Sequence, residues 1–263
     1  MIKLNKIWIK KFVQYLLSDP VSNTYILGNY HKYGIDSKNV IFLIGIDHEK
    51  KHLKFVLMKY YGDYVFFTNE LLGGKEILLI FKKVISQEFR VISGNEFSIN
   101  QLKDVFKNVS FRETSLMVLN KYVSFSNRTL CVRKLNEKDI IEAKRLILSI
   151  EEFEEKFKLN TDTRIRRMIV EDDSFGCFEK DRLISLVSIT AKSPHGCMLT
   201  DVCVDKNYRG RGISKVVISR AIDFLKDGGI GNIALYADKP NAIETYSKIG
   251  FESIGKYLMM YNT

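Results

Sequence analysis

In the second half of the chain, two patterns of apolar residues alternate, one typical of strands and one typical of helices. Short apolar runs bounded by Gly, Asn, Asp or Pro predict strands, and apolar residues three and four positions apart predict amphipathic helices. The order of these segments is βααβββαβαβ, which predicts a mixed α/β domain. We expect strands at 129–133, 175–179, 183–191, 197–204, 232–237 and 251–261, and helices after Asn136, from 161 or 163, after 212 and at 241–248.

The first half of the chain shows the same two spacings and is again α/β. A polar-rich stretch at 122–128 separates the halves, so we predict two domains, 1–127 and 128–263. In the first domain we expect helices at 6–17, 22–32, 75–83 and 99–106, and strands at 40–46, 53–60, 64–67, 89–92 and 116–119.

Composition excludes several classes of protein. The 263 residues are 46% hydrophobic and include only 3 prolines, which argues against a disordered or Pro-rich chain. The cysteines follow neither a CxxC nor a zinc-finger spacing, so we expect a reducing compartment with no disulfide framework and no metal. No secretory or membrane-spanning segment is visible, and we expect a cytoplasmic location. The cysteines are Cys131, Cys177, Cys197 and Cys203.

The charge balance is basic. The net charge is +10, from 41 basic and 31 acidic residues. Such a surplus attracts polyanions in general, including nucleic acids, anionic membranes and phosphate-rich ligands. Because the lysines are scattered rather than gathered into a run, we do not expect a nucleic acid as partner, and a nucleic-acid-binding module ranks last among the alternatives. No membrane partner is expected either, since no membrane-spanning segment is visible.

The segment from Asp201 to Lys215 carries the most informative chemistry. A strand ends, the backbone turns on Gly210 and Gly212, and a long helix begins. Free amides and the positive end of the dipole make a helix N-terminus an anion-binding site. Glycines also let the backbone approach a pyrophosphate closely. A basic loop that only caps the helix is the alternative interpretation.

The loop resembles a known motif. Arg209-Gly-Arg-Gly-Ile-Ser214 is similar to the Arg/Gln-x-x-Gly-x-Gly/Ala acyl-CoA loop of the GNAT superfamily of N-acetyltransferases, and the order of elements matches that fold. Asn241-Ala-Ile-Glu-Thr-Tyr-Ser-Lys-Ile-Gly-Phe251 resembles the end of the same pattern. The resemblance covers 129–263, with Ser214 in place of the usual Gly or Ala. The first half resembles, in fold alone, the degenerate GNAT-like domain of two-domain members, and it has no acyl-CoA loop.

The resemblance implies acetyl-CoA as co-substrate, with no metal. The backbone of the strand before the loop would hydrogen-bond the pantetheine arm, and an amide near Val204 would stabilise the developing oxyanion. The side chains of Val202 and Val204 would also pack in the core. The amides of the loop would hold the pyrophosphate. The implied cofactor-binding residues are Val202, Cys203, Val204, Arg209, Gly210, Arg211, Gly212, Ile213, Ser214 and Asn241.

Two catalytic residues follow from the resemblance. Tyr246 would protonate the leaving thiolate, since a phenol is a neutral donor at physiological pH; the alternative is a core tyrosine. Asp201 is the local candidate for a base or water-ordering carboxylate, because a primary amine must lose a proton before it attacks. Relatives carry a Glu where Thr200 stands, and strand alternation could instead turn Asp201 outward. Asn241 would cap its helix, contact CoA, or both.

Three further features receive structural interpretations. Cys203 is expected to be a buried small hydrophobe rather than an acyl-enzyme nucleophile. His195 is expected to be a turn residue. The acidic run Glu151–Glu155 would be a solvated face or would attract a cationic amine.

The sequence therefore predicts an acyl-CoA-dependent N-acyltransferase that transfers acetyl from acetyl-CoA to an amine by direct attack. A non-catalytic CoA-binding sensor or scaffold on the same fold is the alternative. The expected partner is an amine of a small molecule, a peptide or a protein. Sequence leaves the acceptor, the acyl length and the oligomeric state open.

Overall fold

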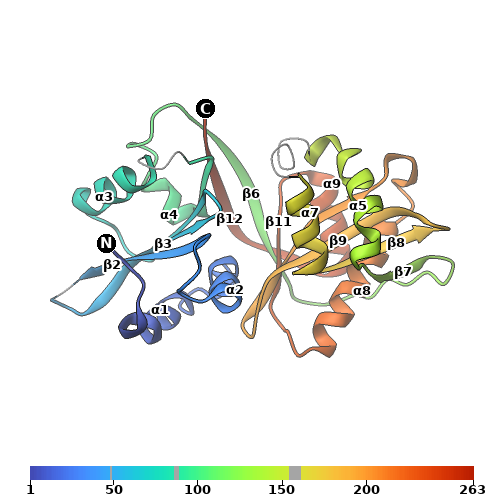
Figure 1. Ribbon diagram of the computed structural model, residues 1–263, viewed down its shortest axis with the longest axis horizontal. Coiled ribbons are helices and arrows are strands. Elements are labelled where there is room, and N and C mark those ends of the chain that lie inside the picture. Colours follow the sequence, from blue (N-terminus) through green and yellow to red (C-terminus); the bar gives the residue numbers. More distant parts are fainter. Residues whose placement is uncertain (48, 86–88, 154–160) are drawn as a thin grey trace. The chain divides into compact units, whose positions relative to one another are not determined.

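The computed structural model describes residues 1–47, 49–85, 89–153 and 161–263 (Figure 1). The chain forms two compact units. The first consists of Met1–Met117, Tyr236–Asp238 and Ser253–Thr263, and the second of Val118–Leu235 and Lys239–Glu252. The first boundary falls between Met117 and Val118 rather than after 127, and two later segments of the chain also join the first unit.

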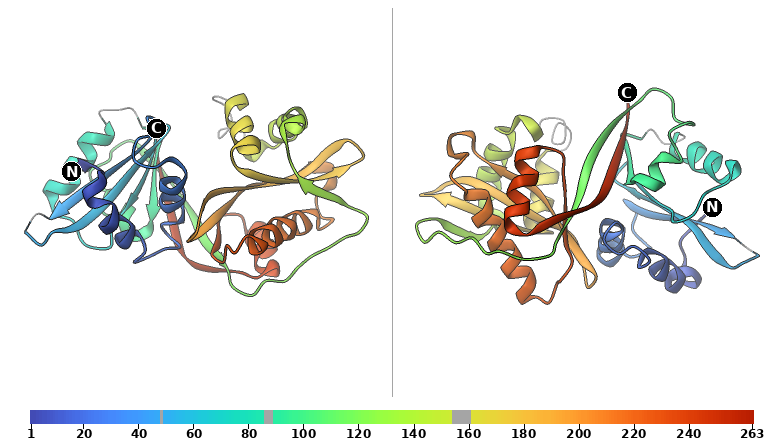
Figure 2. Two further views of the ribbon diagram at one scale, coloured as in Figure 1. Left: turned by 60° about the horizontal axis from the view of Figure 1, so that its bottom comes forward. Right: turned by 180° about the vertical axis from the view of Figure 1, so that it is seen from behind.

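The first unit contains a sheet with helices on both faces (Figure 2). Its strand order is β1-β2-β3-β4-β5-β12, followed by β6. Neighbouring strands from β1 to β12 are antiparallel except β4 and β5, which are parallel. The strands are β1 (Ile2–Lys3), β2 (Val40–Asp47), β3 (His52–Tyr60), β4 (Asp63–Phe67), β5 (Val91–Asn95), β6 (Val109–Leu119) and β12 (Phe251–Asn262), and the helices are the 3₁₀ turn η1 (Lys6–Trp8), α1 (Ile9–Leu16), α2 (Thr24–Tyr33), α3 (Gly74–Ile85) and α4 (Glu96–Asn100).

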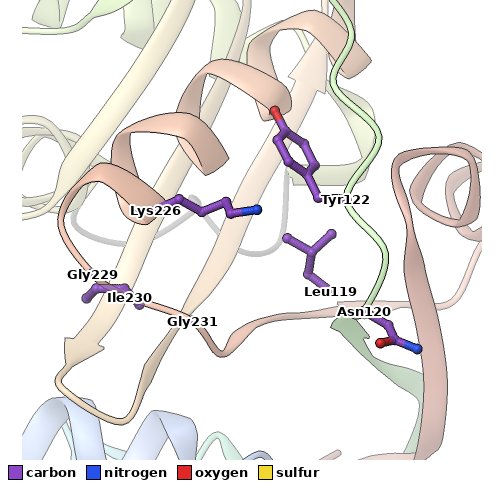
Figure 3. A pocket seen from close by; sticks show the side chains of 7 residues that line it. All are labelled: Leu119, Asn120, Tyr122, Lys226, Gly229, Ile230 and Gly231. Carbon is purple, nitrogen blue, oxygen red and sulfur yellow. The ribbon is translucent and has the colours of Figure 1, made fainter.

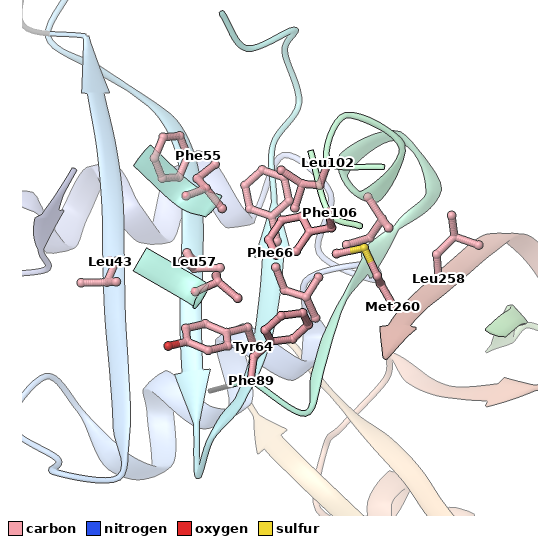
Figure 4. Packing of buried hydrophobic residues seen from close by; sticks show 14 of the residues in the cluster. Leu43, Phe55, Leu57, Tyr64, Phe66, Phe89, Leu102, Phe106, Leu258 and Met260 are labelled. Carbon is pink, nitrogen blue, oxygen red and sulfur yellow. The ribbon is translucent and has the colours of Figure 1, made fainter. Parts of the chain in front are cut away.

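Two cores lie on opposite faces of this sheet, as strand alternation requires. Phe42 of β2 and Val56 of β3 pack with α1 and α2 on one face. Leu43 and Leu57, their neighbours along the same strands, pack with α3 and α4 on the other (Figure 4). Leu258 and Met260 of β12 complete this second core, so the C-terminal strand is an integral part of the first unit.

Side-chain caps mark the starts of two helical segments in the first unit. The side chain of Asn5 accepts a hydrogen bond from the amide of Ile7, and the opening turn is 3₁₀ before α1 begins. Asn95 accepts from the amide of Ser98 at 2.9 Å, so α4 begins before the predicted start at 99.

From β7 to β12 the described elements follow the predicted order βααβββαβαβ, although most of the last strand, β12, belongs to the first unit. Figure 2 shows α5 and α7 on one face of the sheet and α8 on the other. Strands β7 to β10 are antiparallel neighbours, and β10 and β11 are parallel. The elements are β7 (Cys131–Lys134), η2 (Glu137–Asp139), α5 (Ile140–Leu148), η3 (Glu151–Phe153), α7 (Thr161–Val170), β8 (Asp173–Glu179), β9 (Arg182–Ser193), β10 (Gly196–Val204), η4 (Lys206–Tyr208), α8 (Ile213–Asp227), β11 (Ile233–Ala237) and α9 (Pro240–Ile249).

The start of this unit confirms one predicted cap. Asn136 and Asp139 form a capping box at η2, which leads into α5. A hydrogen bond from Arg133 holds the pKa of Asp139 below its usual value, so this carboxylate stays charged at neutral pH. Within the described ranges, no helix is both long and apolar enough to cross a membrane.

Candidate functional site

Strand β10 ends in a bulge against β9. Thr200 pairs with Ser188 and Cys203 with Leu186, so two β10 residues, Asp201 and Val202, stand opposite one β9 residue. Asp201 takes a left-handed conformation with φ of +56°, which Asp tolerates better than most residues. Its half-buried carboxylate accepts a hydrogen bond from the Thr200 hydroxyl at 3.1 Å. The bulge therefore breaks the strict alternation expected along this strand.

Beyond the bulge, side chains hold the carbonyls of β10. The Ser185 hydroxyl donates to the Cys203 carbonyl at 2.7 Å, and the Arg209 Nε donates to the Val204 carbonyl at 3.3 Å. Strand β10 pairs with β11 at Cys197 and Met198 and continues to Val204. The strand thus extends past this pairing toward the glycine turn.

The Cys203 side chain is buried in the core beneath α5 and α7. Burial raises the pKa of this thiol well above its usual value, so the reactive thiolate is disfavoured at neutral pH. The structure thereby agrees with the expectation of a small buried hydrophobe. Val202 and Val204 are half-buried.

The glycine turn leads directly into α8. Gly210 and Gly212 have φ of +80° and +74°, the left-handed region that favours glycine. Gly212 is the N-cap of α8 and supplies no side-chain hydrogen bond to the helix start. A Cβ added at Gly210 would meet no described atom within 4 Å, so open space lies beside the backbone here. Ile213 is buried and fixes the first turn of the helix in the core, and Ser214 is half-buried.

Cationic side chains surround the turn. The Arg211 guanidinium lies 5.1 Å from the centre of the Tyr208 ring, and its Nη2 donates to the Asn207 carbonyl. The Lys215 ammonium lies 4.5 Å from the centre of the Phe125 ring. Because Arg211 and Lys215 are in the turn and the first turn of α8, they add positive charge where the helix dipole is already positive.

The Arg209 guanidinium contacts two other segments of the chain. Its Nε contacts the Val204 carbonyl, and its Nη2 lies 3.3 Å from Oε2 of Glu152 in η3. The other oxygen, Glu152 Oε1, accepts from Lys239 Nζ at 3.1 Å, directly before α9. The amide of Glu152 itself, then Lys239 and Arg209, lower the pKa of this carboxyl from 4.5 to about 2. Glu152 is therefore anionic at neutral pH and joins three segments of the second unit.

Within the acidic run, Glu152 fits neither of the two predicted roles, a solvated face or an attractor for a cationic amine. Glu152 is ion-paired with Arg209 and Lys239, so it is neither a purely solvated residue nor a free attractor for an amine. Glu151 is exposed, and Glu154 and Glu155 lie outside the described residues.

Helix α9 corrects one prediction. Asn241 does not cap it, because the helix begins at Pro240 with Lys239 in the N-cap position. Proline is favoured at the first helical position, since it lacks the amide hydrogen that would otherwise be unsatisfied there. Asn241 is exposed, and its carbonyl accepts from the Thr245 hydroxyl.

Tyr246 lies in the middle of α9. Its side chain is 9% exposed, and its ring packs edge-on against Phe251 at 6.0 Å between ring centres. The packing fits a core tyrosine, while the remaining exposure leaves the ring at the border of the core. His195 occupies an exposed turn as predicted, with its amide donating to the Ser193 hydroxyl and its carbonyl accepting from Asn232.

A shallow pocket lies at the other end of α8 (Figure 3). Leu119, Tyr122, Lys226 and Ile230 are among its lining residues. The Tyr122 hydroxyl donates to Asp223 at 2.8 Å, so this polar group is already satisfied by α8. Because α8 has 15 residues, at about 1.5 Å per residue this pocket lies about 20 Å from the glycine turn and belongs to a separate surface.

Sequence reasoning missed Lys239 and Ser185. Lys239 follows β11 just as the glycine turn follows β10, and adjacent parallel strands end at the same edge of a sheet. This rule could have predicted that Lys239 lies near the glycine turn. Ser185 carried no signal, because its contact with the Cys203 carbonyl depends on the strand register.

Part of the chain resembles known proteins in sequence. Residues 141–251 match the profile described as "Acetyltransferase (GNAT) family". A relative named histone acetyltransferase TAP1, from Glycine max, is 37% identical over 75 residues, which are 28% of this chain and 32% of that protein. The chain spans about a third of the length of the curated relatives it matches first.

Solved structures match over nearly the whole chain. A Drosophila protein aligns with a TM-score of 0.76 at 12% identity, covering 99% of this chain and 97% of that one. A tandem GNAT protein from the clavulanic acid biosynthesis pathway aligns with a TM-score of 0.64 at 8% identity, covering 98% and 96%. Residues 141–251 therefore carry the sequence pattern of the GNAT acetyltransferase family, and the chain has the fold of a solved tandem GNAT protein.

Proposed function

We propose that the protein is an acyl-CoA-dependent N-acyltransferase that moves acetyl from acetyl-CoA to an amine. The observation that carries the proposal is the uncapped start of α8, where two left-handed glycines directly follow the bulged end of β10. Residues 141–251, which match the GNAT family, contain all of these features.

The glycine turn fits a pyrophosphate. The amides from Arg209 to Ser214 include the first amides of α8, which have no partner within the helix. Gly210 has open space beside its backbone, and Arg211 and Lys215 supply positive charge close by. An anion here would gain hydrogen bonds from the backbone and favourable interaction with the helix dipole.

The end of β10 suits the pantetheine arm. An extended ligand can add to a strand edge through backbone hydrogen bonds. The segment Val202–Val204 lies beyond the pairing of β10 with β11 and leads into the glycine turn. This arrangement would place the thioester near the Val204 amide, which we assign to the developing oxyanion.

The transfer needs a base and an acid. The neutral amine attacks the thioester carbon, a C–N bond forms, the C–S bond breaks, and the thiolate takes up a proton. We assign that last proton to the Tyr246 hydroxyl, and the deprotonation of the amine to Asp201, directly or through an ordered water. Thr200 has no acidic group, and its hydroxyl donates a hydrogen bond to Asp201.

The remaining assignments are proposals of the same kind. We assign the first unit to a degenerate GNAT-like domain, since a tandem GNAT protein matches the chain over 98% of its length. The acceptor is an amine of a small molecule, a peptide or a protein, and one relative is named a histone acetyltransferase. A cytoplasmic location stays a prediction.

Two glycines that flank α8 provide a test of the proposed pyrophosphate site with a matched control. Gly212 and Gly229 lie at opposite ends of the helix, have φ of +74° and +75°, and leave room for a Cβ. Alanine at either position carries a similar strain of about 1–2 kcal/mol. We expect Gly212→Ala to weaken CoA binding at least about tenfold in calorimetric titration, because the methyl group and the altered backbone disturb the pyrophosphate amides.

Gly229→Ala is expected to lose similar stability but to bind CoA like the unmodified protein. Equal CoA affinities for the two variants would contradict the assignment of the glycine turn to the pyrophosphate. Thermal unfolding of both variants shows whether the strain is matched.

A further inference from the structure

We propose that Glu152 is an internal competitor for the phosphate groups of CoA: its carboxylate holds Arg209 and Lys239 in the free protein and releases them when the CoA phosphates bind. This inference rests on the proposed function and adds an affinity-determining residue to the same site. It concerns the free protein, before the acyl donor arrives.

The contacts of Glu152 converge on the two segments that frame the site. Arg209 opens the glycine turn after β10, and Lys239 directly precedes α9, which carries Tyr246. The three side chains keep partial solvent access, with exposures of 50% for Arg209, 35% for Glu152 and 50% for Lys239. Because the cluster is accessible, a dissolved anion can compete for its cations.

The carboxylate of Glu152 accepts hydrogen bonds from these cations, as the oxygens of a phosphate group would. Nη2 of Arg209 contacts one carboxylate oxygen, and Nη1 of Arg209 and Nζ of Lys239 contact the other. The distances of 3.1–3.5 Å are longer than those of optimal charge-assisted hydrogen bonds. The diphosphate of CoA as a whole carries more negative charge and more acceptor oxygens than one carboxylate, so an exchange of partners is favourable.

The ion pairs of Glu152 with Arg209 and Lys239 are weak enough for such an exchange. Partly exposed ion pairs are individually weak, because water and salt screen them. Removing the carboxylate frees two cations, and a gain of about 0.7–1.4 kcal/mol corresponds to a three- to tenfold increase in affinity. The exchange also has a structural consequence, since it detaches η3 from the glycine turn and from the start of α9.

Calorimetric titration with CoA tests the inference on three full-length proteins: unmodified, Glu152→Gln and Glu151→Gln. Glu151 is the neighbouring exposed carboxylate, and in the described part of the chain it has no ion pair, so its variant makes the same change in net charge. We expect Glu152→Gln to bind CoA about three- to tenfold more tightly, and Glu151→Gln to stay within twofold of the unmodified protein.

The outcomes separate the two claims. An unchanged or weaker affinity for Glu152→Gln, with CoA still bound by the unmodified protein, overturns the competitor role and leaves the proposed function intact. An equal gain in both variants also overturns it, because the effect is then one of net charge. Failure of all three proteins to bind CoA overturns the proposed function together with this inference.

Combining the substitution with Lys239→Met adds a readout that a purely structural role of Glu152 would not move. If Glu152 competes through Lys239, the gain from Glu152→Gln shrinks in the Lys239→Met background. A gain of full size there overturns the part assigned to Lys239.

Discussion

Replacing Tyr246 with Phe is expected to lower kcat for amine acetylation by about 10²-fold while leaving the affinity for CoA unchanged. A positioned general acid contributes typically 10² to 10⁴ in rate, and a thiolate is a good leaving group, which favours the lower end. The ring is buried to 9% exposure against Phe251, so Phe preserves its packing. Steady-state release of free thiol with a responsive amine measures the effect.

Tyr122→Phe is the matched control for this prediction. It removes a hydroxyl that is hydrogen-bonded to Asp223 and to the Ser219 carbonyl, at the far end of α8. We expect this variant to lose about 1–2 kcal/mol of unfolding free energy and to keep its kcat. If kcat is the same in Tyr246→Phe and the unmodified protein, the hydroxyl of Tyr246 is not the acid, and a core tyrosine is the correct interpretation.

The largest effect on stability is expected at Gly250. This residue ends α9 with φ of +109°, and its amide donates to the Tyr246 and Ser247 carbonyls. A Cβ built here would lie 1.8 Å from the Lys121 carbonyl oxygen, which is backbone and has little freedom to move. We expect Gly250→Ala to destabilise the protein by about 3 kcal/mol or more, because steric overlap adds to backbone strain.

Thermal unfolding measures this loss, and a shift in Tm of roughly 6–12 °C is expected for a unit of this size. Gly229→Ala separates strain from overlap, since Gly229 has φ of +75° and no described atom within 4 Å of an added Cβ. Its Tm should fall by much less. Equal shifts would show that the approach of Lys121 does not restrict Gly250.

Local signals explain why much of the fold follows from sequence. The glycine turn, the Asn136 capping box and the glycine that ends α9 each depend on residues adjacent in the chain. Such features are set by backbone geometry and short-range hydrogen bonds, which sequence spacing records. The prediction that Asn241 caps α9 was wrong although the signal is also local, because the adjacent Pro240 takes the first helical position.

Long-range pairing explains the differences. Tyr257 of β12 pairs with Asn95 of β5, and nothing in either segment specifies this partner among the apolar strands of the chain. The contact between Lys239 and Glu152 joins residues 87 positions apart. The bulge at Asp201 depends on the register of β9 and β10. Each arises only once distant segments are packed together, so composition and spacing do not reveal it.

The proposed function requires that residues 209–214 bind an acyl-CoA and that the bound acyl group is transferred to an amine. Calorimetric titration of the full-length protein with acetyl-CoA and with CoA, followed by measurement of free-thiol release with a panel of amines, tests it most directly. We expect saturable binding of both ligands and thiol release that depends on an amine. Absence of binding to either ligand would contradict the assignment of the glycine turn, and with it the proposed reaction.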